Sequence, residues 1–227
     1  MRFATPLVPA RLLRRYKRFL ADVRLDDGRE VTAHCPNPGA MIGLADADMR
    51  IWLEPNDDPK KKLKFGWRLT ELPGCHLAGI DTSVPNRVIG EALRAGAIPE
   101  LQGDVRAEVP YGTRSRVDFT VGGTFVEVKN VHLRRDADWA EFPDCVTARG
   151  LKHLEELSRV VQDGGRAVML YLVQRTDCGR FRLAADLDPA YATGFERARA
   201  AGVEVLCYGT QIDREGVTLG TRLPVDG

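Results

Sequence analysis

Short runs of alternating hydrophobic and polar residues fill the first 80 positions of this 227-residue chain. Alternation with a period of two is typical of strands with one buried face, and clusters of Pro, Gly and Asn/Asp separate the runs. The Asp26-Asp27-Gly28 turn predicts a hairpin between the first two of them. The predicted strands are Phe19–Arg24, Glu30–His34, Met49–Leu53, Phe65–Glu71 and His76–Ile80. Several short strands at this spacing predict a small barrel or sandwich.

The period of the pattern changes after residue 82. Hydrophobic residues recur at helical spacing in Asn86–Ala95 and in Cys145–Gln162, with Asp144 as the predicted N-cap of the longer helix. Further elements are strands at 105–110, 116–121, 124–131, 167–173 and 203–208 and a helix at 189–201. Strands that alternate with helices describe an α/β domain. We therefore divide the chain into a small β domain, residues 1–82, and an α/β domain, residues 83–227.

The strongest local signal is the Gly122-Gly123 pair between two of these strands. Both central residues of a two-residue hairpin turn need positive φ, which glycine adopts without strain. In that register Asp118 lies directly opposite Glu127, and Arg116 lies directly opposite Lys129. A three-residue loop with a bulge would shift the pairing.

The side chains of this hairpin favour a metal site. Because side chains alternate along strands, Asp118, Glu127 and Lys129 share one face. Two opposed carboxylates with Cβ atoms roughly 5 Å apart repel each other, and a divalent cation between them removes that penalty. Oxygen ligands of this kind suit Mg²⁺. The alternative is a solvated strand face on which diagonal ion pairs satisfy the charges, and spacing alone leaves both interpretations open.

A metal at this hairpin suits the hydrolysis of phosphodiesters. Mg²⁺ or Mn²⁺ on Asp118 and Glu127 would polarise a phosphoryl oxygen and activate a bound water. Lys129 would orient that water or offset the charge that builds on the phosphate. Arg116 would bind the substrate phosphate bidentately, unless it forms a simple ion pair with a neighbouring carboxylate.

The long predicted helix adds cations beside this site. Arg149 and Lys152 fall on one flank, where they could guide a nucleic-acid backbone. Pairing with Glu155 or Glu156 is the alternative for that flank. His153 lies at the edge of the packing stripe and is favoured as a packed core residue over a functional one.

A second basic cluster lies near the N-terminus, where cations surround Tyr16 and Phe19. Basic residues interleaved with aromatic ones suit phosphate contacts and base stacking, and a solvated basic edge is the alternative. The candidate nucleic-acid contacts are Arg14, Arg15, Lys17 and Arg18. Lys60–Lys62 follow an Asn-Asp-Asp-Pro turn and are predicted to lie in a loop without a specific role.

The overall charge of the chain is nearly balanced, and its cysteines are few and scattered. The net charge is +1, with a basic excess of +4 in residues 1–80 (14 Lys/Arg against 10 Asp/Glu) that is compatible with a polyanion partner. The five cysteines are odd in number and never form a Cys-x-x-Cys pair. They indicate reduced thiols in a cytoplasmic protein rather than a disulfide framework or a zinc site. No signal peptide or 18-residue apolar run is visible, so we expect no membrane association.

Four motifs in this order resemble the sugar fermentation stimulation protein A (SfsA) family. They are Cys35-Pro-Asn-Pro-Gly-Ala-Met41, Arg116-Val-Asp-Phe119, Val126-Glu-Val-Lys129 and Phe142-Pro-Asp-Cys-Val-Thr-Ala-Arg-Gly-Leu-Lys-His-Leu-Glu-Glu-Leu157. The last block is long and unusual enough to be highly specific. The resemblance implies an OB-fold-like small β-barrel followed by a PD-(D/E)XK nuclease-like α/β domain with a mixed central sheet. It also implies DNA binding that is largely independent of sequence. Single-stranded or branched DNA is one candidate partner, and the sequence leaves the preferred DNA structure open.

The resemblance assigns roles to residues of this chain. It implies that Asp118, Glu127 and Lys129 match the nuclease motif, although Val117 stands where the motif's name has Pro. It also gives Glu91, on the first predicted helix of the second domain, the place of an extra metal ligand, whereas the helical spacing alone is explained by pairing with Arg87. We expect a Mg²⁺-dependent deoxyribonuclease. The alternatives are a non-catalytic DNA-binding regulator of sugar (maltose) metabolism and, more distantly, a hydrolase of small phosphoesters.

Overall fold

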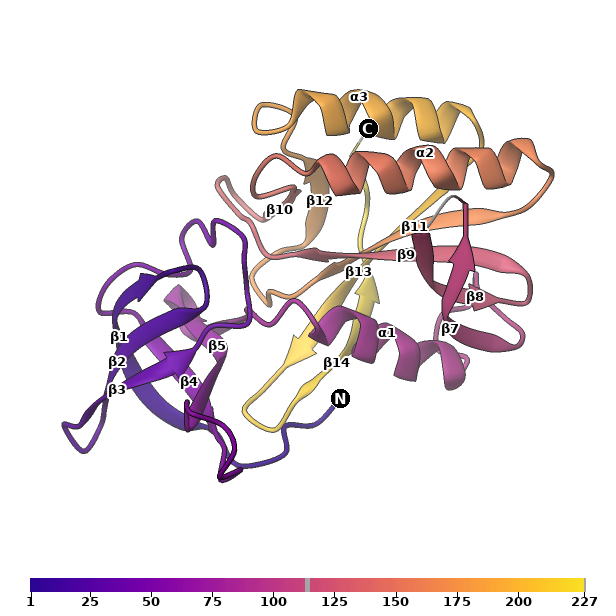
Figure 1. The fold of residues 1–227 in the computed structure, drawn as a ribbon. Coiled ribbons are helices and arrows are strands. Elements are labelled where there is room, and N and C mark those ends of the chain that lie inside the picture. The colour runs from indigo at the N-terminus through magenta and orange to yellow at the C-terminus, as the bar shows by residue number, and fades with distance from the viewer. Residues whose placement is uncertain (113–114, 227) are drawn as a thin grey trace.

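The computed structural model describes residues 1–112 and 115–226, in which a β-barrel precedes an α/β domain (Figure 1). The barrel domain comprises β1 (Val8–Tyr16), β2 (Leu20–Leu25), β3 (Glu30–His34), β4 (Arg50–Pro55), β5 (Phe65–Leu72), the 3-10 helix η1 (Pro73–Cys75) and β6 (His76–Gly79). The five predicted strands are all present. The sequence pattern did not show β1, because Pro9 and a register shift between Leu12 and Arg14 interrupt its alternation.

The barrel closes through its third strand. Its strands follow the order β3-β2-β1-β4-β5-β6, and a parallel pairing of His34 with Gly66 joins β3 to β5. Closure turns one face of every strand inward, onto a core that includes the fully buried Leu12, Leu53 and Trp67. Each such side chain contributes about 1.5–3 kcal/mol of burial free energy. The predicted OB-fold-like barrel is confirmed.

The second domain contains a six-stranded mixed sheet in the order β14-β13-β11-β9-β8-β7. Its elements are α1 (Val84–Arg94), β7 (Val105–Tyr111), β8 (Ser115–Val121), β9 (Thr124–Val131), β10 (Trp139–Phe142), α2 (Ala148–Gln162), β11 (Ala167–Val173), β12 (Arg180–Leu183), α3 (Pro189–Ala200), β13 (Glu204–Ile212) and β14 (Val217–Arg222). The central strands β9, β11 and β13 run parallel, and the outer strands pair antiparallel. The short strands β10 and β12, which were not predicted, form a separate parallel pair.

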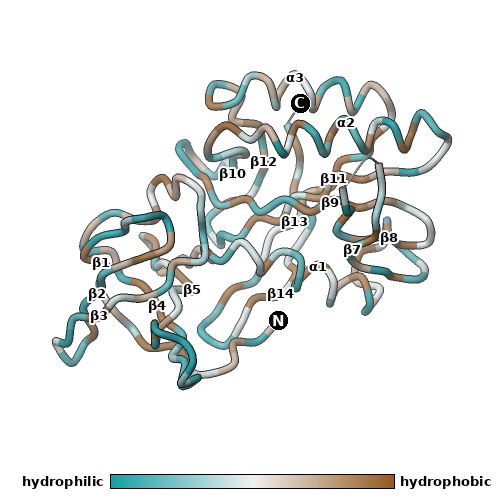
Figure 2. Tube along the Cα trace, viewed as in Figure 1, coloured by the Kyte–Doolittle hydropathy of each residue, from teal (hydrophilic) through white to brown (hydrophobic). Residues whose placement is uncertain are grey.

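Helices cover both faces of the central sheet (Figure 1). Val126 and Val128 of β9 belong to the core that includes α1, whereas Phe125 and Val131 pack in the core that includes α2 and α3. All seven residues of β11 are buried, as expected for a parallel strand covered on both faces. The tube in Figure 2 shows hydrophobic residues gathered along these central strands. Alternation along β9 therefore turns Glu127 and Lys129 toward α2.

The start of α2 differs from the prediction. The helix begins at Ala148, and its N-cap is Thr147, whose side chain accepts a hydrogen bond from the amide of Gly150 at 3.1 Å. Asp144, the predicted cap, instead accepts from the amide of Met41 in the barrel domain at 3.3 Å. The capping prediction was wrong because a contact between distant parts of the chain engages this carboxylate.

The two domains are tied together at several places. Gly79 donates its amide hydrogen to the carbonyl of Gln174 at 2.9 Å, extending β6 toward the α/β domain. The first residues of the chain also pair with the α/β domain, where the amide of Phe3 donates to the carbonyl of Glu215 at 2.9 Å. The N-terminus accordingly lies beside β14 and α1 in Figure 1. None of the helices in the described part of the chain is long and apolar enough to cross a membrane.

Candidate functional site

The hairpin of β8 and β9 has the turn and the initial register expected from Gly122-Gly123. The paired residues are Val121 with Thr124, Thr120 with Phe125 and Phe119 with Val126. Gly122 and Gly123 have φ of 54° and 88°, the positive values that this turn requires.

The pairing ends before it reaches the predicted site residues. Asp118 does not form a ladder pair with Glu127, because its Oδ2 atom accepts the amide hydrogen of Val128 at 2.7 Å. Arg116 pairs with Pro110 of β7 rather than with Lys129 of β9. Here β8 stays with β7 while β9 continues along β11, so the two strands separate at Asp118. The predicted opposition of these residues was wrong beyond Phe119, although Asp118 still lies against β9.

Three side chains form a compact group between β9 and α2. Lys129 Nζ donates to Glu127 Oε1 at 2.8 Å and lies 3.1 Å from His153 Nδ1. His153 Nδ1 also contacts Glu127 Oε1 directly. Glu127 and His153 are only 2% and 6% exposed. Sequence reasoning favoured His153 as a core residue, whereas the structure joins it to two of the predicted catalytic residues.

The two carboxyl groups differ in their electrostatics. Burial, and then the negative charge of Glu127, raise the pKa of Asp118, against the opposing hydrogen bonds from Val128 and Asn86. Burial alone would also raise the pKa of Glu127, but the hydrogen bond from His153 and the charge of Lys129 outweigh it and lower that pKa. The pair therefore combines one stabilised carboxylate with one whose negative charge is disfavoured.

Within the described residues, one oxygen of the Glu127 carboxylate is free to bind a cation. Glu127 Oε2 is buried and has no hydrogen-bond partner among the described residues, while Oε1 of the same carboxylate is engaged by Lys129 and His153. A buried carboxylate oxygen without a partner is costly, and a nearby cation would offset that cost and the disfavoured charge of Asp118. No cluster of three or more His, Cys, Asp or Glu able to hold a metal is found in the described ranges. Mg²⁺ is commonly bound by one or two carboxylates, with waters and phosphate oxygens as its other ligands.

Glu91 is not brought to this group. Its carboxylate pairs with the N-terminal ammonium of Met1 at 2.5 Å, and its side chain is 57% exposed. Asn86 of the same helix reaches the site instead, where Nδ2 donates to Asp118 Oδ1 at 2.7 Å. Five residues along a helix turn the side chain by about 140°, so Asn86 and Glu91 point in different directions. Sequence reasoning missed Asn86, because nothing local marks this half-buried amide as a partner of a distant carboxylate.

The predicted cations of α2 and β8 have separate surroundings. Arg149 Nε lies 3.3 Å from His153 Nε2, which places it at the edge of the site. Lys152 lies 3.6 Å from Glu156 Oε1, so the pairing considered as the alternative is present. Arg116 is exposed and donates to the carbonyl of Glu108 at 3.2 Å, an interaction that leaves the side chain open to solvent.

The N-terminal cations lie on the barrel. Arg14 pairs with Asp22 at 2.8 Å and its guanidinium stacks 4.9 Å from the ring centre of Tyr16. Arg15 donates to the carbonyls of Asn37 and Gly39, so it holds the loop after β3 in place. Lys17 and Arg18 are exposed in the loop between β1 and β2, both with positive φ.

Comparison with protein families assigns both domains. The model described as "Sugar fermentation stimulation protein RE domain" matches residues 83–216, and the "SfsA N-terminal OB domain" matches residues 13–80. The chain belongs to the SfsA family. A sugar fermentation stimulation protein homolog of Dinoroseobacter shibae is 70% identical across the whole of this chain and 96% of its own length. The corresponding homolog of Jannaschia sp. is 66% identical, across the whole of this chain and 97% of its own length.

A solved structure has the same architecture over the full length. It is described as the structure of Pyrococcus furiosus SfsA in complex with Ca²⁺. The two chains share 27% sequence identity and superpose with a TM-score of 0.89, covering 100% of this chain and 98% of the other. The fold is thus that of SfsA, an OB barrel joined to a nuclease-like mixed-sheet domain.

Proposed function

We propose that this chain binds DNA with little dependence on sequence and hydrolyses its phosphodiester bonds with Mg²⁺ or Mn²⁺ as cofactor. The observation that carries the proposal is the buried Glu127 Oε2, which has no partner among the described residues, on a carboxylate whose charge acts on Asp118 and whose other oxygen accepts from Lys129. Relatives support it in one respect, since the solved SfsA of Pyrococcus furiosus is described as a complex with a divalent cation.

Each residue has a distinct role in the proposed reaction. Asp118 and Glu127 Oε2 would hold the metal, which when bound supplies Lewis acidity and a water of lowered pKa. Lys129, kept in position by Glu127 Oε1 and His153, places a positive charge where the attacked phosphate gathers negative charge. Asn86 fixes the orientation of the Asp118 carboxylate.

The basic side chains around the site would position the DNA. Arg149 is exposed at the edge of the site and Arg116 is exposed on β8, and phosphate contacts of this kind fix a nucleic acid without selecting a sequence. The barrel cations Lys17 and Arg18 would add contacts outside the site. We propose the cytoplasm as the place of action, where the free thiols of all five cysteines are maintained.

The proposal is tested by cleavage. Plasmid and single-stranded DNA are incubated with Mg²⁺ or Mn²⁺ and the wild type, Asp118→Asn or Lys129→Ala. Removing a metal ligand, or the positive charge of Lys129 that would face the phosphate, should lower cleavage by about 100-fold or more. Unchanged cleavage in both variants would remove the proposed site. DNA binding without cleavage under either metal would favour the non-catalytic regulator, an alternative that the name of the curated homologs supports only weakly.

A further inference from the structure

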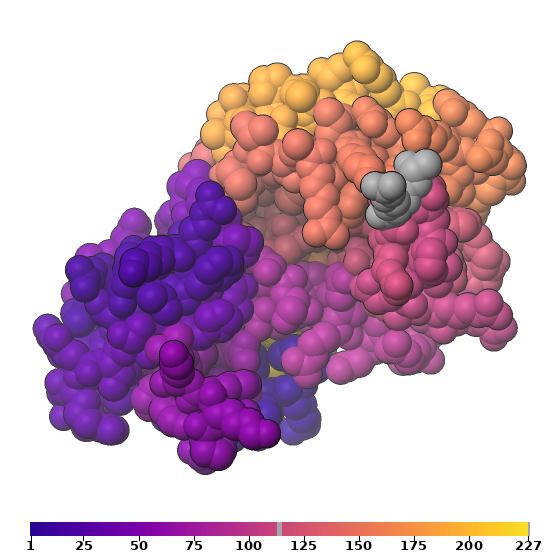
Figure 3. All heavy atoms as spheres, viewed as in Figure 1, coloured from indigo at the N-terminus to yellow at the C-terminus, as the bar shows by residue number. Residues whose placement is uncertain are grey.

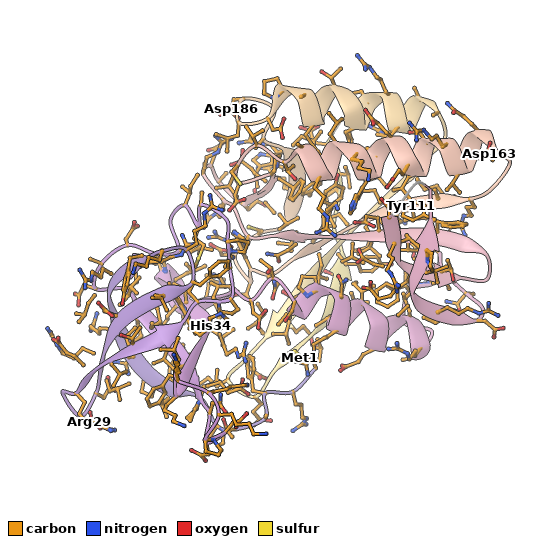
Figure 4. The ribbon with its side chains drawn as sticks, viewed as in Figure 1. Met1, Arg29, His34, Tyr111, Asp163 and Asp186 are labelled. Atoms are coloured by element: carbon orange, nitrogen blue, oxygen red, sulfur yellow. The ribbon has the colours of Figure 1, made fainter. Side chains whose placement is uncertain are left out.

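A groove of about 790 Å³ lies between the barrel and α1, outside the metal site. The start of the chain forms one wall, and the loop between β4 and β5 with the adjoining end of β5 forms another. Figure 3 shows the surface hollowed between the barrel domain and α1, with the N-terminal segment at the lower end of the hollow. In Figure 4 His34 and Met1 lie on opposite sides of this space.

The groove has an excess of positive charge. Five Lys and Arg line it against three carboxylates, and Arg68 engages two of those carboxylates, Glu54 at 2.7 Å and Asp81. Within the described ranges, the lining side chains of Lys61, Lys62 and Arg87 have no ion-pair partner, and all three are exposed. Three such cations around one concave surface favour an anionic ligand.

Aromatic side chains face the same groove from both domains. Phe3 packs against the core of the α/β domain, Phe65 packs against the barrel core, and both remain partly accessible. Cations that track phosphates together with rings on which bases stack are the composition of single-strand binding surfaces. Paired and stacked bases of a duplex are not available to such rings, so the composition selects unpaired nucleotides.

The first turn of α1 connects the groove with the metal site. Arg87 lines the groove, and its neighbour Asn86 donates to Asp118. Asp81 lies in the groove wall, and its carbonyl accepts from Gln174, which also donates to Asn130, next to Lys129 on β9. A strand in the groove would therefore lie within one helical turn of the residues that orient Asp118.

We propose that this groove binds a single-stranded segment of the nucleic acid, with phosphates on Lys61, Lys62 and Arg87 and bases against Phe3 and Phe65. The inference rests on the proposed function for the identity of the polymer, but it does not require cleavage. It gives Lys61 and Lys62 a role that sequence reasoning did not, because only the fold brings their loop opposite α1.

The test measures binding without catalysis. Fluorescence anisotropy with a labelled single-stranded oligonucleotide in EDTA is recorded at several salt concentrations for the wild type, the double variant Lys61→Ala/Lys62→Ala, and Arg87→Ala. The matched control is Lys60→Ala, which removes a cation of the same loop that does not line the groove. Losing two single-strand phosphate contacts should make the negative slope of log K against log salt shallower by about 1.4 and should weaken the affinity roughly tenfold. Arg87→Ala should make the slope shallower by about 0.7, and Lys60→Ala should leave it unchanged.

The outcomes separate this inference from the nuclease proposal. If the double variant has the slope and affinity of the wild type, the groove is not the binding site for the single strand, even where DNA is cleaved. A reduced slope in a protein that cleaves nothing supports the groove and rejects the nuclease. The duplex of the same sequence and an abasic strand of equal length complete the test. Equal effects of the variants on duplex and single strand, or equal affinity for abasic and normal strands, overturn the assignment to unpaired bases.

Discussion

The side chain of Asp118 accepts a 2.7 Å hydrogen bond from the backbone amide of Val128, and this bond takes the place of the next backbone pair between β8 and β9. The carboxylate is thereby inserted between two strands that separate at this point. Its burial raises its pKa, so the same contact that positions the group also makes its ionisation unfavourable. The site is built from a locally destabilising charge, which gives the first prediction.

Asp118→Asn should abolish the stabilisation that a bound metal gives the protein. Because the folded-state pKa of Asp118 is raised, the ionised group costs stability above its unfolded pKa, and a bound cation offsets that cost. The amide lacks the charge that holds the cation, and its NH₂ group would face one of the two donors of Asp118, Asn86 Nδ2 or the Val128 amide. Differential scanning fluorimetry of both proteins with and without Mg²⁺ measures the effect. Mg²⁺ at ten times its Kd should add about 1.4 kcal/mol to the wild type and nothing to the variant. An equal response of both proteins to Mg²⁺ would contradict this role.

His153 should act as a positioning residue for Lys129 and Glu127. His153→Ala removes the ring that touches both groups and leaves Glu127 less well compensated, so its pKa should rise. We expect cleavage to fall by about 10–100-fold and the acidic limb of its pH profile to move toward higher pH. His153→Gln, which keeps a hydrogen-bonding side chain, should recover part of the loss. A drop in activity with an unchanged pH profile would mean that the ring serves packing alone.

The two turn glycines should differ in their tolerance of alanine. A Cβ on Gly122 would lie 2.5 Å from the carbonyl oxygen of Gln102, whereas a Cβ on Gly123 would meet nothing within 4 Å. Gly123→Ala should cost about 1 kcal/mol, the strain of positive φ alone. Gly122→Ala should cost more than that and should also lower cleavage, because the turn sets the pairing of β8 with β9 that precedes Asp118 and Glu127. Urea unfolding measures the first effect, and equal losses in the two variants would reject the contact with Gln102.

Asp144 should stabilise the protein in a way that disappears in acid. Its pKa is about 2, because the hydrogen bond and charge of His132 outweigh the effect of burial. A lowered folded-state pKa gives stability that is present above the unfolded value near 3.9 and is lost as pH falls toward 2. Asp144→Asn should therefore cost about 2 kcal/mol at pH 7 and progressively less below about pH 4. Unfolding curves at both pH values test this, and a difference from the wild type that persisted at low pH would contradict the linkage.

Local patterns predicted the parts of this molecule that depend on neighbouring residues. Gly122-Gly123 determines its own turn, and β11 is hydrophobic throughout because helices cover both of its faces. The register prediction failed beyond Phe119 for a different reason. A side-chain acceptor ended the ladder there, and no local pattern distinguishes Asp118 as a ladder residue from Asp118 as a partner of the Val128 amide.

The remaining differences come from contacts between distant segments. Glu91 was assigned to the site by analogy, but the chain start pairs with it and Asn86 takes its place beside Asp118. Asp144 has the sequence context of a helix cap, but in the fold its carboxylate accepts from the amide of Met41 in the barrel domain. Residues whose side chains can satisfy several partners are the ones for which the choice depends on tertiary structure.

The pairing of the first residues with the hairpin before β14 means that the barrel is attached to the α/β domain at both of its ends. One connection runs through residues 4–7 and the other through residues 80–83, and the chain is anchored to the α/β domain beyond each of them. The hydrogen bonds from Gly79 to Gln174 and from Met41 to Asp144 hold the barrel against the α/β domain between these two connections. A shortened protein that starts at residue 83 would lose Met1 from the core under α1 and uncover that surface to water. The α/β domain therefore includes the first three residues of the chain as well as residues 83–226, and residues 83–226 alone should fold poorly.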